Sequence, residues 1–228
     1  MISVKKHILE NKYFSWLQFV SNWLLQGIFH ADKSERLYKI LFTVIFGCVF
    51  MLLLHYGFDL SWGKGVMVGF LISHTLNWIV NNNFNVLIRH RIKWKRTSKE
   101  KLFGYLHQVR DRMIKAPDSD WALYIVSHGG ICRGTLNEHS DIDVSIIRKP
   151  GFINMLKAIV FYVKEKKIAD LNGVPLDIFI CDSPENCISR AGGQKNPIEI
   201  FDMENNVGRY YDRNMVLSID EARKLNEN

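Results

Sequence analysis

The sequence has few cysteines and few prolines, and both shortages exclude classes of protein. Four cysteines are spread over 228 residues without a C-x-x-C pair: Cys48, Cys132, Cys181 and Cys187. They are too sparse for a disulfide scaffold and lack the spacing of a zinc site, so we expect reduced intracellular thiols. Only five prolines occur and 47% of the residues are hydrophobic, which excludes intrinsic disorder as the main state.

Internal repeats and low-complexity tracts are also missing. No small-residue cleavage site follows the first apolar run, so we do not expect a cleavable signal peptide. At about 100–200 residues per domain, the length allows one soluble domain and an appendage, or two very small domains. Lysine and arginine total 30 against 23 acidic residues, a formal net charge of +7. This excess is concentrated around the apolar segments.

Charge is absent from two long stretches in the first half of the chain. Residues 37–58 (LYKILFTVIFGCVFMLLLHYGF) carry none between Ile40 and Leu54, and residues 65–88 carry none at all, although polar residues interrupt them. At 1.5 Å per residue, either stretch is long enough to cross a hydrocarbon core of about 30 Å. We therefore predict a helical membrane hairpin with spans at about 37–58 and 65–88. The alternatives are a buried hairpin in a soluble protein and a second segment that stays at the interface.

Basic residues flank both apolar stretches, whereas the short link between them holds only Lys64. The flanking residues are Lys5, Lys6, Lys12, Lys33, Arg36 and Lys39 before the first stretch, and Arg89, Arg91, Lys93, Lys95, Arg96, Lys99 and Lys101 after the second. By the positive-inside rule, we expect a multi-pass protein of the cell membrane with both termini and the soluble half in the cytoplasm. The cluster RHRIKWKR is compatible with nucleic acid, but its position directly after an apolar segment favours lipid headgroups.

Residues 7–29 (HILENKYFSWLQFVSNWLLQGIF) are rich in aromatic residues, and apolar residues recur there at three- and four-residue steps. This spacing predicts an amphipathic helix. Because tryptophan and tyrosine favour the membrane–water boundary, we expect the helix to lie in the interface, with packing against the protein as the alternative. Residues 1–98 as a whole are thus predicted to form a membrane-associated helical region.

Residues 99–228 have the pattern of a soluble α+β domain. Amphipathic periodicity predicts helices over 99–115, 152–167 and 218–225, and β-branched or aromatic runs predict strands over 121–127, 142–147 and 174–181, with 198–203 extended. The order helix–strand–strand–helix–strand indicates a small mixed β-sheet with flanking helices.

Three aspartates in this domain lie at or inside predicted strands, where they could bind a metal ion. Asp141 and Asp143 flank Ile142 at the start of a strand, so their side chains share one face. Carboxylates this close repel unless a positive charge lies between them, and Mg²⁺ prefers oxygen ligands. Asp177 lies inside another apolar strand and would complete a three-carboxylate cluster if the two strands are neighbours. The alternative is an aspartate bonded to a backbone amide or an arginine.

A glycine-containing loop, SHGGICRG, precedes these aspartates. Gly129 and Gly130 allow backbone amides to approach an anion, and Arg133 can neutralise a phosphate or brace the loop. A Gly-Gly loop alone is most often just a turn. Its combination with a D-x-D motif on the following strand, and with a further strand aspartate, is much more specific.

The segment GGICRGTLNEHSDIDV resembles the GSxARGxxxxxSDxDL signature of the minimal nucleotidyltransferases, a family of the DNA polymerase β-like superfamily. The five-residue gap between Gly134 and Ser140 matches, and so does the later strand aspartate. The resemblance covers roughly residues 100–185 and does not extend to the membrane-associated region. It departs at Gly130, where the family has serine, and at Cys132, where the family has alanine.

This resemblance implies a nucleotidyltransferase fold with two Mg²⁺ ions. The residues that it carries over are Asp141, Asp143 and Asp177 as metal ligands and catalytic groups, and Gly129, Gly130, Arg133 and Ser140 as nucleotide-binding residues. Asp177 would also help to deprotonate the attacking hydroxyl. The serine missing at Gly130 removes one hydrogen bond, worth about 0.5–1.5 kcal/mol, which would slow catalysis without abolishing it.

The resulting expectation is a membrane-anchored nucleotidyltransferase that moves NMP from an NTP such as ATP to a hydroxyl or phosphate acceptor at the cytoplasmic membrane face, releasing pyrophosphate. Its location suggests a lipid-linked acceptor or an envelope precursor. The alternatives are a catalytically weakened nucleotide-binding or regulatory module on the membrane, and a small transferase that modifies a protein partner. Nucleic acid is not expected as a partner, because no thumb-like helical domain follows residue 185.

Other polar residues near the motif are weaker candidates. His128 and His139 flank the loop and could contact substrate, while Arg190, Lys195 and Arg209 could form a phosphate-binding rim. Such residues are more often simply solvated surface groups.

Overall fold

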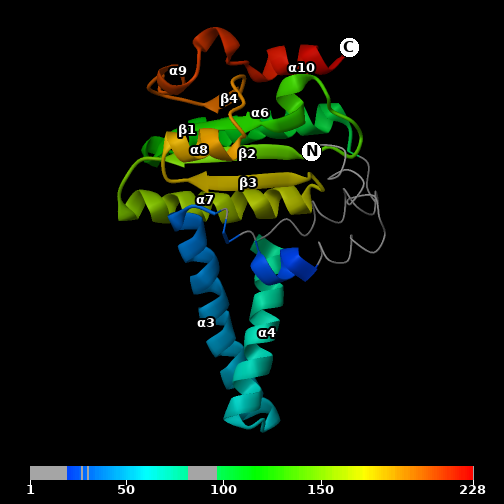
Figure 1. The fold of residues 1–228 in the computed structure, drawn as a ribbon, viewed down its shortest axis with the longest axis vertical. Coiled ribbons are helices and arrows are strands. Elements are labelled where there is room, and N and C mark those ends of the chain that lie inside the picture. Colours follow the sequence, from blue (N-terminus) through cyan, green and yellow to red (C-terminus); the bar gives the residue numbers. More distant parts are fainter. Residues whose placement is uncertain (1–19, 27, 30, 82–96, 228) are drawn as a thin grey trace. The chain divides into compact units, whose positions relative to one another are not determined.

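The structure is a computed structural model that describes residues 20–26, 28, 29, 31–81 and 97–227 (Figure 1). Contacts divide the chain into two compact units, Met1–His30 with Tyr38–Phe84 and Ala31–Leu37 with Asn85–Asn228. Residues 31–37, which the sequence assigned to the membrane-associated region, therefore cluster with the second unit. The predicted interfacial helix lies mostly outside the described residues, and the basic cluster RHRIKWKR lies wholly outside them.

The first unit contains two long apolar helices. The first turn of α3 (Lys33–Phe58) belongs to the second unit, and the rest of the helix belongs to this unit. α4 (Trp62–Asn81) follows after a short link, in which Asp59 has a φ of 52°. By length and composition α3 alone, among the described helices, is suited to cross a membrane, and only 6% of its most apolar window is buried.

The buried faces of these two helices are mostly small and polar. α4 buries Gly65, Gly69, Ser73, Asn77 and Asn81 at four-residue steps, together with Trp78. A Cβ added at Gly69 would lie 2.8 Å from the backbone N of Met51, so only glycine permits this close approach. Asn77 donates to the Lys39 carbonyl and to Thr43 Oγ1, both at 2.9–3.0 Å. Many of the apolar side chains of both helices are exposed.

The second unit is built on a four-stranded mixed sheet of order β3-β2-β1-β4. Its strands are β1 (Ala122–His128), β2 (Ile142–Arg148), β3 (Leu176–Cys181) and β4 (Ile198–Phe201). β1 is antiparallel to both β2 and β4, while β2 and β3 are parallel and joined by a helical crossover. The predicted α+β class with a small mixed sheet is confirmed, and the structure meets the condition that the second and third strands are neighbours.

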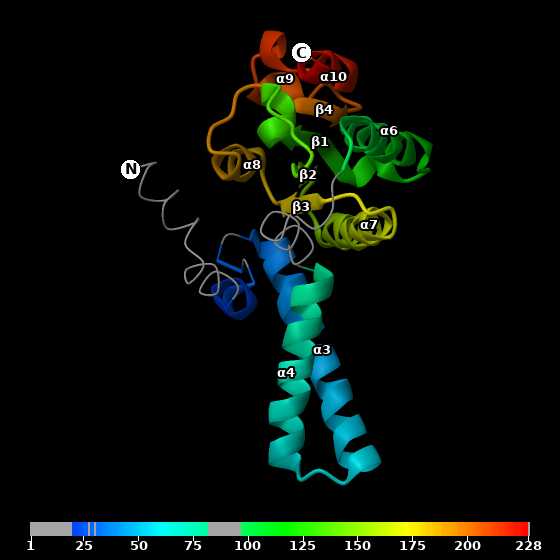
Figure 2. The ribbon, with the colours of Figure 1, turned by 90° about the vertical axis from the view of Figure 1, so that its right-hand side faces the viewer.

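Helices cover both faces of this sheet. α6 (Lys99–Lys115) and α7 (Phe152–Leu171) lie on one side, and α8 (Pro184–Arg190) on the other (Figure 2). α9 (Val207–Tyr210) and α10 (Ile219–Glu227) complete the C-terminal part, with 3₁₀ turns at Ser119–Trp121, Gly129–Arg133 and Arg213–Met215. The pattern α6–β1–β2–α7–β3 was predicted, but α8 was not, because seven residues are too few to show a helical period.

Serine residues at the N-cap positions set the starts of two helices. α6 begins at the N-cap Ser98, whose hydroxyl accepts from the Lys101 amide, and buries the apolar stripe that its periodicity predicts. α8 begins in the same way at Ser183, with Pro184 in its first turn. These caps satisfy amides that would otherwise be left without partners at the helix starts.

A buried ion pair joins α6 to α7. The Glu165 side chain is fully buried, and its carboxylate accepts from Arg112 Nε at 2.7 Å and Nη2 at 2.6 Å. The Tyr105 hydroxyl donates to the same carboxylate at 3.0 Å. Burial, followed by the charge and hydrogen bond of Glu165, raises the pKa of Tyr105 above its ordinary range.

We expect Arg112→Met to destabilise the second unit by about 3–5 kcal/mol, because it leaves a buried carboxylate without its cation. Urea denaturation of the full chain in detergent measures the loss. Arg110→Met is the matched control, since Arg110 is half-exposed and pairs only with its neighbour Asp111. Equal stability of the two variants would contradict the prediction.

Candidate active site

One row of side chains crosses three adjacent strands on the sheet face that α8 covers. His128 on β1 lies opposite Asp143 on β2, and Asp143 lies opposite Asp177 on β3. Residues paired across strands point to the same face, so the three side chains stand side by side. The next row on this face includes Ser145 and Phe179. Strand register thus brings Asp143 and Asp177 together from positions 34 residues apart in the sequence.

The environment of this row is buried and acidic. Burial is the main cause that raises the pKa of Asp177, with the charges of Asp143 and Asp141 adding to it and Lys166 opposing them. Asp141 lies directly before β2, outside the strand, so the predicted placement on the face of Asp143 by strand alternation does not apply to it. Burial lowers the pKa of His128 to about 4, so this imidazole is neutral at pH 7. Its Nε2 lies 3.2 Å from the Tyr211 hydroxyl.

The oxygen donors of the three aspartates have the chemistry that Mg²⁺ requires. Asp143 and Asp177 are in register, and Asp141 affects the Asp177 pKa together with Asp143. Within the described part of the chain, however, no group of three or more His, Cys, Asp or Glu side chains is in position to hold a metal ion. The three carboxylates therefore have the chemistry to bind Mg²⁺, but the described side chains are not arranged around a common metal position.

The loop after β1 is packed directly against this row. Gly129 has a φ of 87°, and a Cβ added there would overlap Oδ2 of Asp143. Both the backbone conformation and the space therefore require glycine. Gly130 does not share either restriction, since its added Cβ would lie 3.3 Å from the rotatable Thr135 hydroxyl. The loop forms the 3₁₀ turn Gly129–Arg133.

The side chain of Gln194 lies on this loop. Its Oε1 accepts from the Gly129 amide at 2.9 Å and from Arg133 Nη1 at 3.3 Å. Both partners are donors, which assigns the oxygen to this position. A backbone amide and a guanidinium are also the groups that bind phosphate oxygens. Gln194 follows Gly192 and Gly193, both of which have positive φ and open space around their Cα atoms.

A cavity of about 320 Å³ is lined by His128 and Asp143 of the row and by the loop, whereas Asp141 and Asp177 do not line it. Its lining residues are His128, Gly129, Arg133, Asp143, Ser145, Phe179, Arg190, Ala191 and Gln194. Arg190 stands over the Phe179 ring, with its guanidinium carbon 3.9 Å from the ring centre. The cavity thus combines a carboxylate with two guanidinium groups and a loop amide that Gln194 now occupies. Such a lining suits an anionic ligand that carries its own cation.

The other predicted site residues have different positions. Ser140 holds the turn before Asp141, because its hydroxyl accepts from the Asn137 amide at 2.9 Å, and it does not line the cavity. His139 pairs with Glu138 at the surface. Lys195 and Arg209 are exposed and also lie outside the cavity lining. Of the predicted phosphate rim, Arg190 alone contributes to the lining.

Several lining residues were not predicted. Ser145 and Phe179 each follow a row aspartate by two residues, so strand periodicity could have found them. Gln194 has a weaker signal, the preceding Gly-Gly pair. Arg190 also contacts Glu35 in the first turn of α3, a partner 155 residues away that no local pattern indicates.

Comparison of the chain with protein-family models, with curated proteins and with solved structures gives no match in any of the three. Arguments about function therefore rest on the residues and geometry described above.

We expect Gly129→Ala to lower the free energy of unfolding by at least about 1–2 kcal/mol, because the new side chain both strains the backbone and displaces Asp143. Gly130→Ala is the matched control, and we expect it to cost less than about 1 kcal/mol. Denaturant unfolding of the two variants in parallel measures the difference. Equal losses would show that the loop is not fixed against Asp143 as described.

Proposed function

We propose that this chain is a nucleotidyltransferase that transfers NMP from an NTP to a hydroxyl or phosphate acceptor and releases pyrophosphate. The observation that carries the proposal is the juxtaposition of Asp143 and Asp177 in one row, directly beside the Gly129 loop. The motif resemblance of residues 129–144 to minimal nucleotidyltransferases points to the same chemistry. The structure adds to the motif the spatial neighbourhood of Asp143 and Asp177, which the order of residues in the sequence does not show.

The roles of the residues follow from their positions. Arg133 and the Gly129 amide would bind phosphate oxygens in the place that Gln194 Oε1 now occupies. The acceptor oxygen would attack the α-phosphorus as the bond to pyrophosphate breaks, and Asp177 would take the acceptor's proton. Asp141, Asp143 and Asp177 would hold Mg²⁺, which when bound neutralises charge on the α-phosphate and on the departing pyrophosphate.

A second candidate is a nucleotide-binding module with little or no turnover. Two observations favour it: the serine of the family motif is Gly130 here, and the described side chains do not form a ready three-residue metal group. The two candidates make the same prediction for nucleotide binding and opposite predictions for pyrophosphate release.

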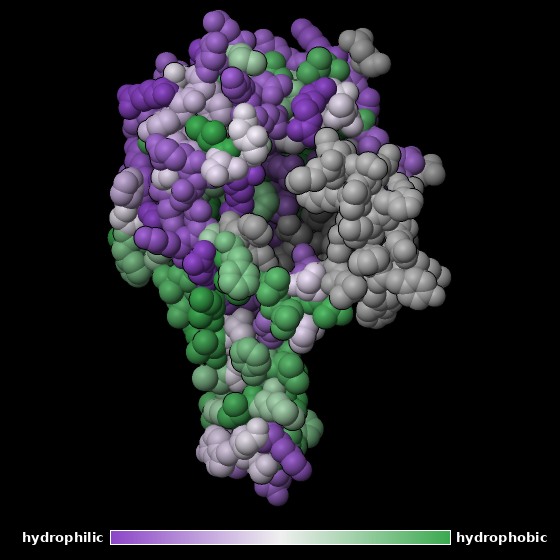
Figure 3. Space-filling view, viewed as in Figure 1, coloured by the Kyte–Doolittle hydropathy of each residue, from purple (hydrophilic) through white to green (hydrophobic). Residues whose placement is uncertain are grey.

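We further propose that the first unit is a membrane hairpin in which both α3 and α4 cross the bilayer. The support is the packing of the two helices, in which the buried residues are mostly small or polar. Apolar residues are exposed along α3 and α4, as Figure 3 shows. Helices in lipid pack through small residues and satisfy polar groups between themselves. The positive-inside rule then gives cytoplasmic termini and catalytic unit, and this position favours a lipid-linked or envelope-precursor acceptor.

We expect Asp143→Asn to lower Mg²⁺-dependent pyrophosphate release at least about 100-fold, because it removes a carboxylate that would hold the Mg²⁺ needed to neutralise charge at the reacting phosphate. The assay uses the full chain with each labelled NTP, with and without lipid extract. Asp120→Asn is the control, since Asp120 is exposed and lies outside the cavity lining. If the wild type releases pyrophosphate and Asp143→Asn releases it equally fast, the proposed catalytic role of this site is refuted. Nucleotide binding without release would support the second candidate.

For the hairpin, we expect a cysteine at its link to face outward. In a Cys48→Ser background, Ser61→Cys should react with an impermeant maleimide in intact cells, whereas Glu138→Cys should react only after lysis. Both positions are exposed in the structure, so a difference in labelling reports sidedness rather than burial. Equal labelling of the two cysteines in intact cells would contradict a hairpin with this orientation.

A further inference from the structure

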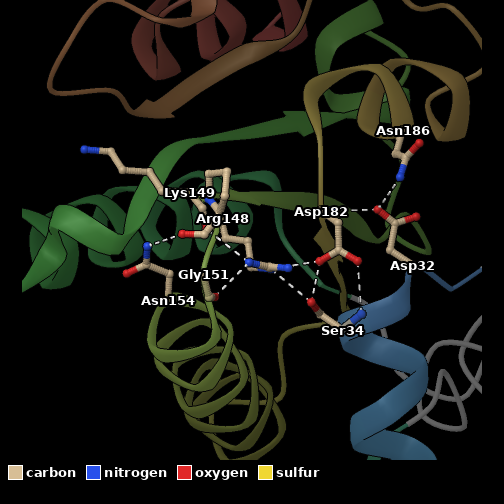
Figure 4. A network of polar contacts seen from close by, with 9 residues as sticks. Asp32, Ser34, Arg148, Lys149, Gly151, Asn154, Asp182 and Asn186 are labelled. Carbon is tan, nitrogen blue, oxygen red and sulfur yellow. Dashed lines mark hydrogen bonds and ion pairs between the residues drawn. The ribbon is translucent and has the colours of Figure 1, made fainter.

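The first turn of α3 is bound tightly to the C-terminal end of β3 and to α8, all within the second unit (Figure 4). Asp182 accepts from the Ser34 amide at 3.1 Å and from the Ser34 hydroxyl, and Arg148 Nε bonds both residues at 2.8–2.9 Å. Asp32 accepts from the Asp182 amide at 2.7 Å and from Asn186 Nδ2 at 3.0 Å. The turn therefore has a fixed position against the elements that carry the cavity.

Glu35 lies in the same turn, and its carboxylate forms an ion pair with Arg190, which lines the cavity. Its side chain is 2% exposed, and Oε2 lies 3.2 Å from Arg190 Nη1. Arg190 is held on its other side by the ring of Phe179, which is itself part of the cavity lining. An arginine has five N–H donors in a rigid fork. A contact through Nη1 leaves donors of the same fork to meet a ligand in the cavity.

We propose that Glu35 is a positioning residue that holds Arg190 to bind the polyphosphate part of the substrate. Stacking on Phe179 fixes the plane of the guanidinium, and the ion pair with Glu35 fixes its rotation in that plane. An arginine fixed in this way loses less conformational freedom when it binds phosphate. Glu35 also balances the arginine's charge when the cavity is empty. This inference rests on the proposed nucleotidyl transfer and identifies a part of the site outside the motif.

A double-mutant cycle on the full chain in detergent tests the inference. The variants are Glu35→Gln, Arg190→Gln and the two combined, and Lys33→Gln is a control from the same turn, because Lys33 is exposed. The probe is inorganic tripolyphosphate with Mg²⁺, measured by calorimetry, and melting temperature is recorded for each variant. Binding of tripolyphosphate does not require transfer, so the result is separate from the activity assay.

We expect Arg190→Gln to weaken binding at least about tenfold and Glu35→Gln to weaken it about three- to tenfold, with no effect for Lys33→Gln. In the Arg190→Gln background, Glu35→Gln should have no further effect, because Glu35 acts through Arg190. A purely structural ion pair would lower the melting temperature and leave affinity unchanged, which would overturn the inference.

The remaining outcomes are also decisive. Additive losses in the cycle would overturn the role of Glu35, and absence of tripolyphosphate binding by the wild type would overturn the inference entirely. If the cycle shows that the effects of Glu35→Gln and Arg190→Gln are coupled, but no NTP yields pyrophosphate, the positioning role of Glu35 is supported. The proposed transferase activity is then the part that fails.

Discussion

The parallel pairing of β2 with β3 is the constraint on which the site depends. It places two carboxylates side by side, with Asp141 near enough to act on the Asp177 pKa, in an environment that disfavours negative charge. A folded protein tolerates such a group only with compensating cations. The same face accordingly receives Arg133 and Arg190, and Lys166 acts on Asp177. The glycine loop fits here because the Asp143 carboxylate leaves no space for a side chain at Gly129.

Much of this arrangement could be predicted from local pattern. Alternation of apolar residues located the strands, whereas the two-residue step that placed Asp141 on the face of Asp143 does not apply, because Asp141 lies directly before β2. The register that brings Asp177 opposite Asp143 could be stated only as a condition, because pairing between strands depends on the length and packing of α7. Ser140 was assigned from the motif, yet its hydroxyl is engaged in the turn before Asp141. Contacts such as Glu35 with Arg190 join distant segments and have no local signal.

The hairpin shows how composition can be misleading without geometry. In the sequence, Ser73, Asn77 and Asn81 looked like interruptions that weaken the second apolar stretch. In the structure they form the buried side of α4, where Ser73 donates to the Thr43 carbonyl and Asn81 bonds Asn77. Average hydropathy counts such residues against a membrane helix, although in lipid they are what holds two helices together.

α3 is one uninterrupted helix whose first turn clusters with the sheet, and this has a practical consequence for dissecting the protein. A soluble fragment beginning at Thr97 would retain the whole sheet and every motif residue. It would nevertheless lack Asp32, Ser34 and Glu35, and would expose their partners on β3 and α8 to water. A defect in such a fragment could then come from the lost support of Asp182 and Arg190 and would not by itself show a need for lipid.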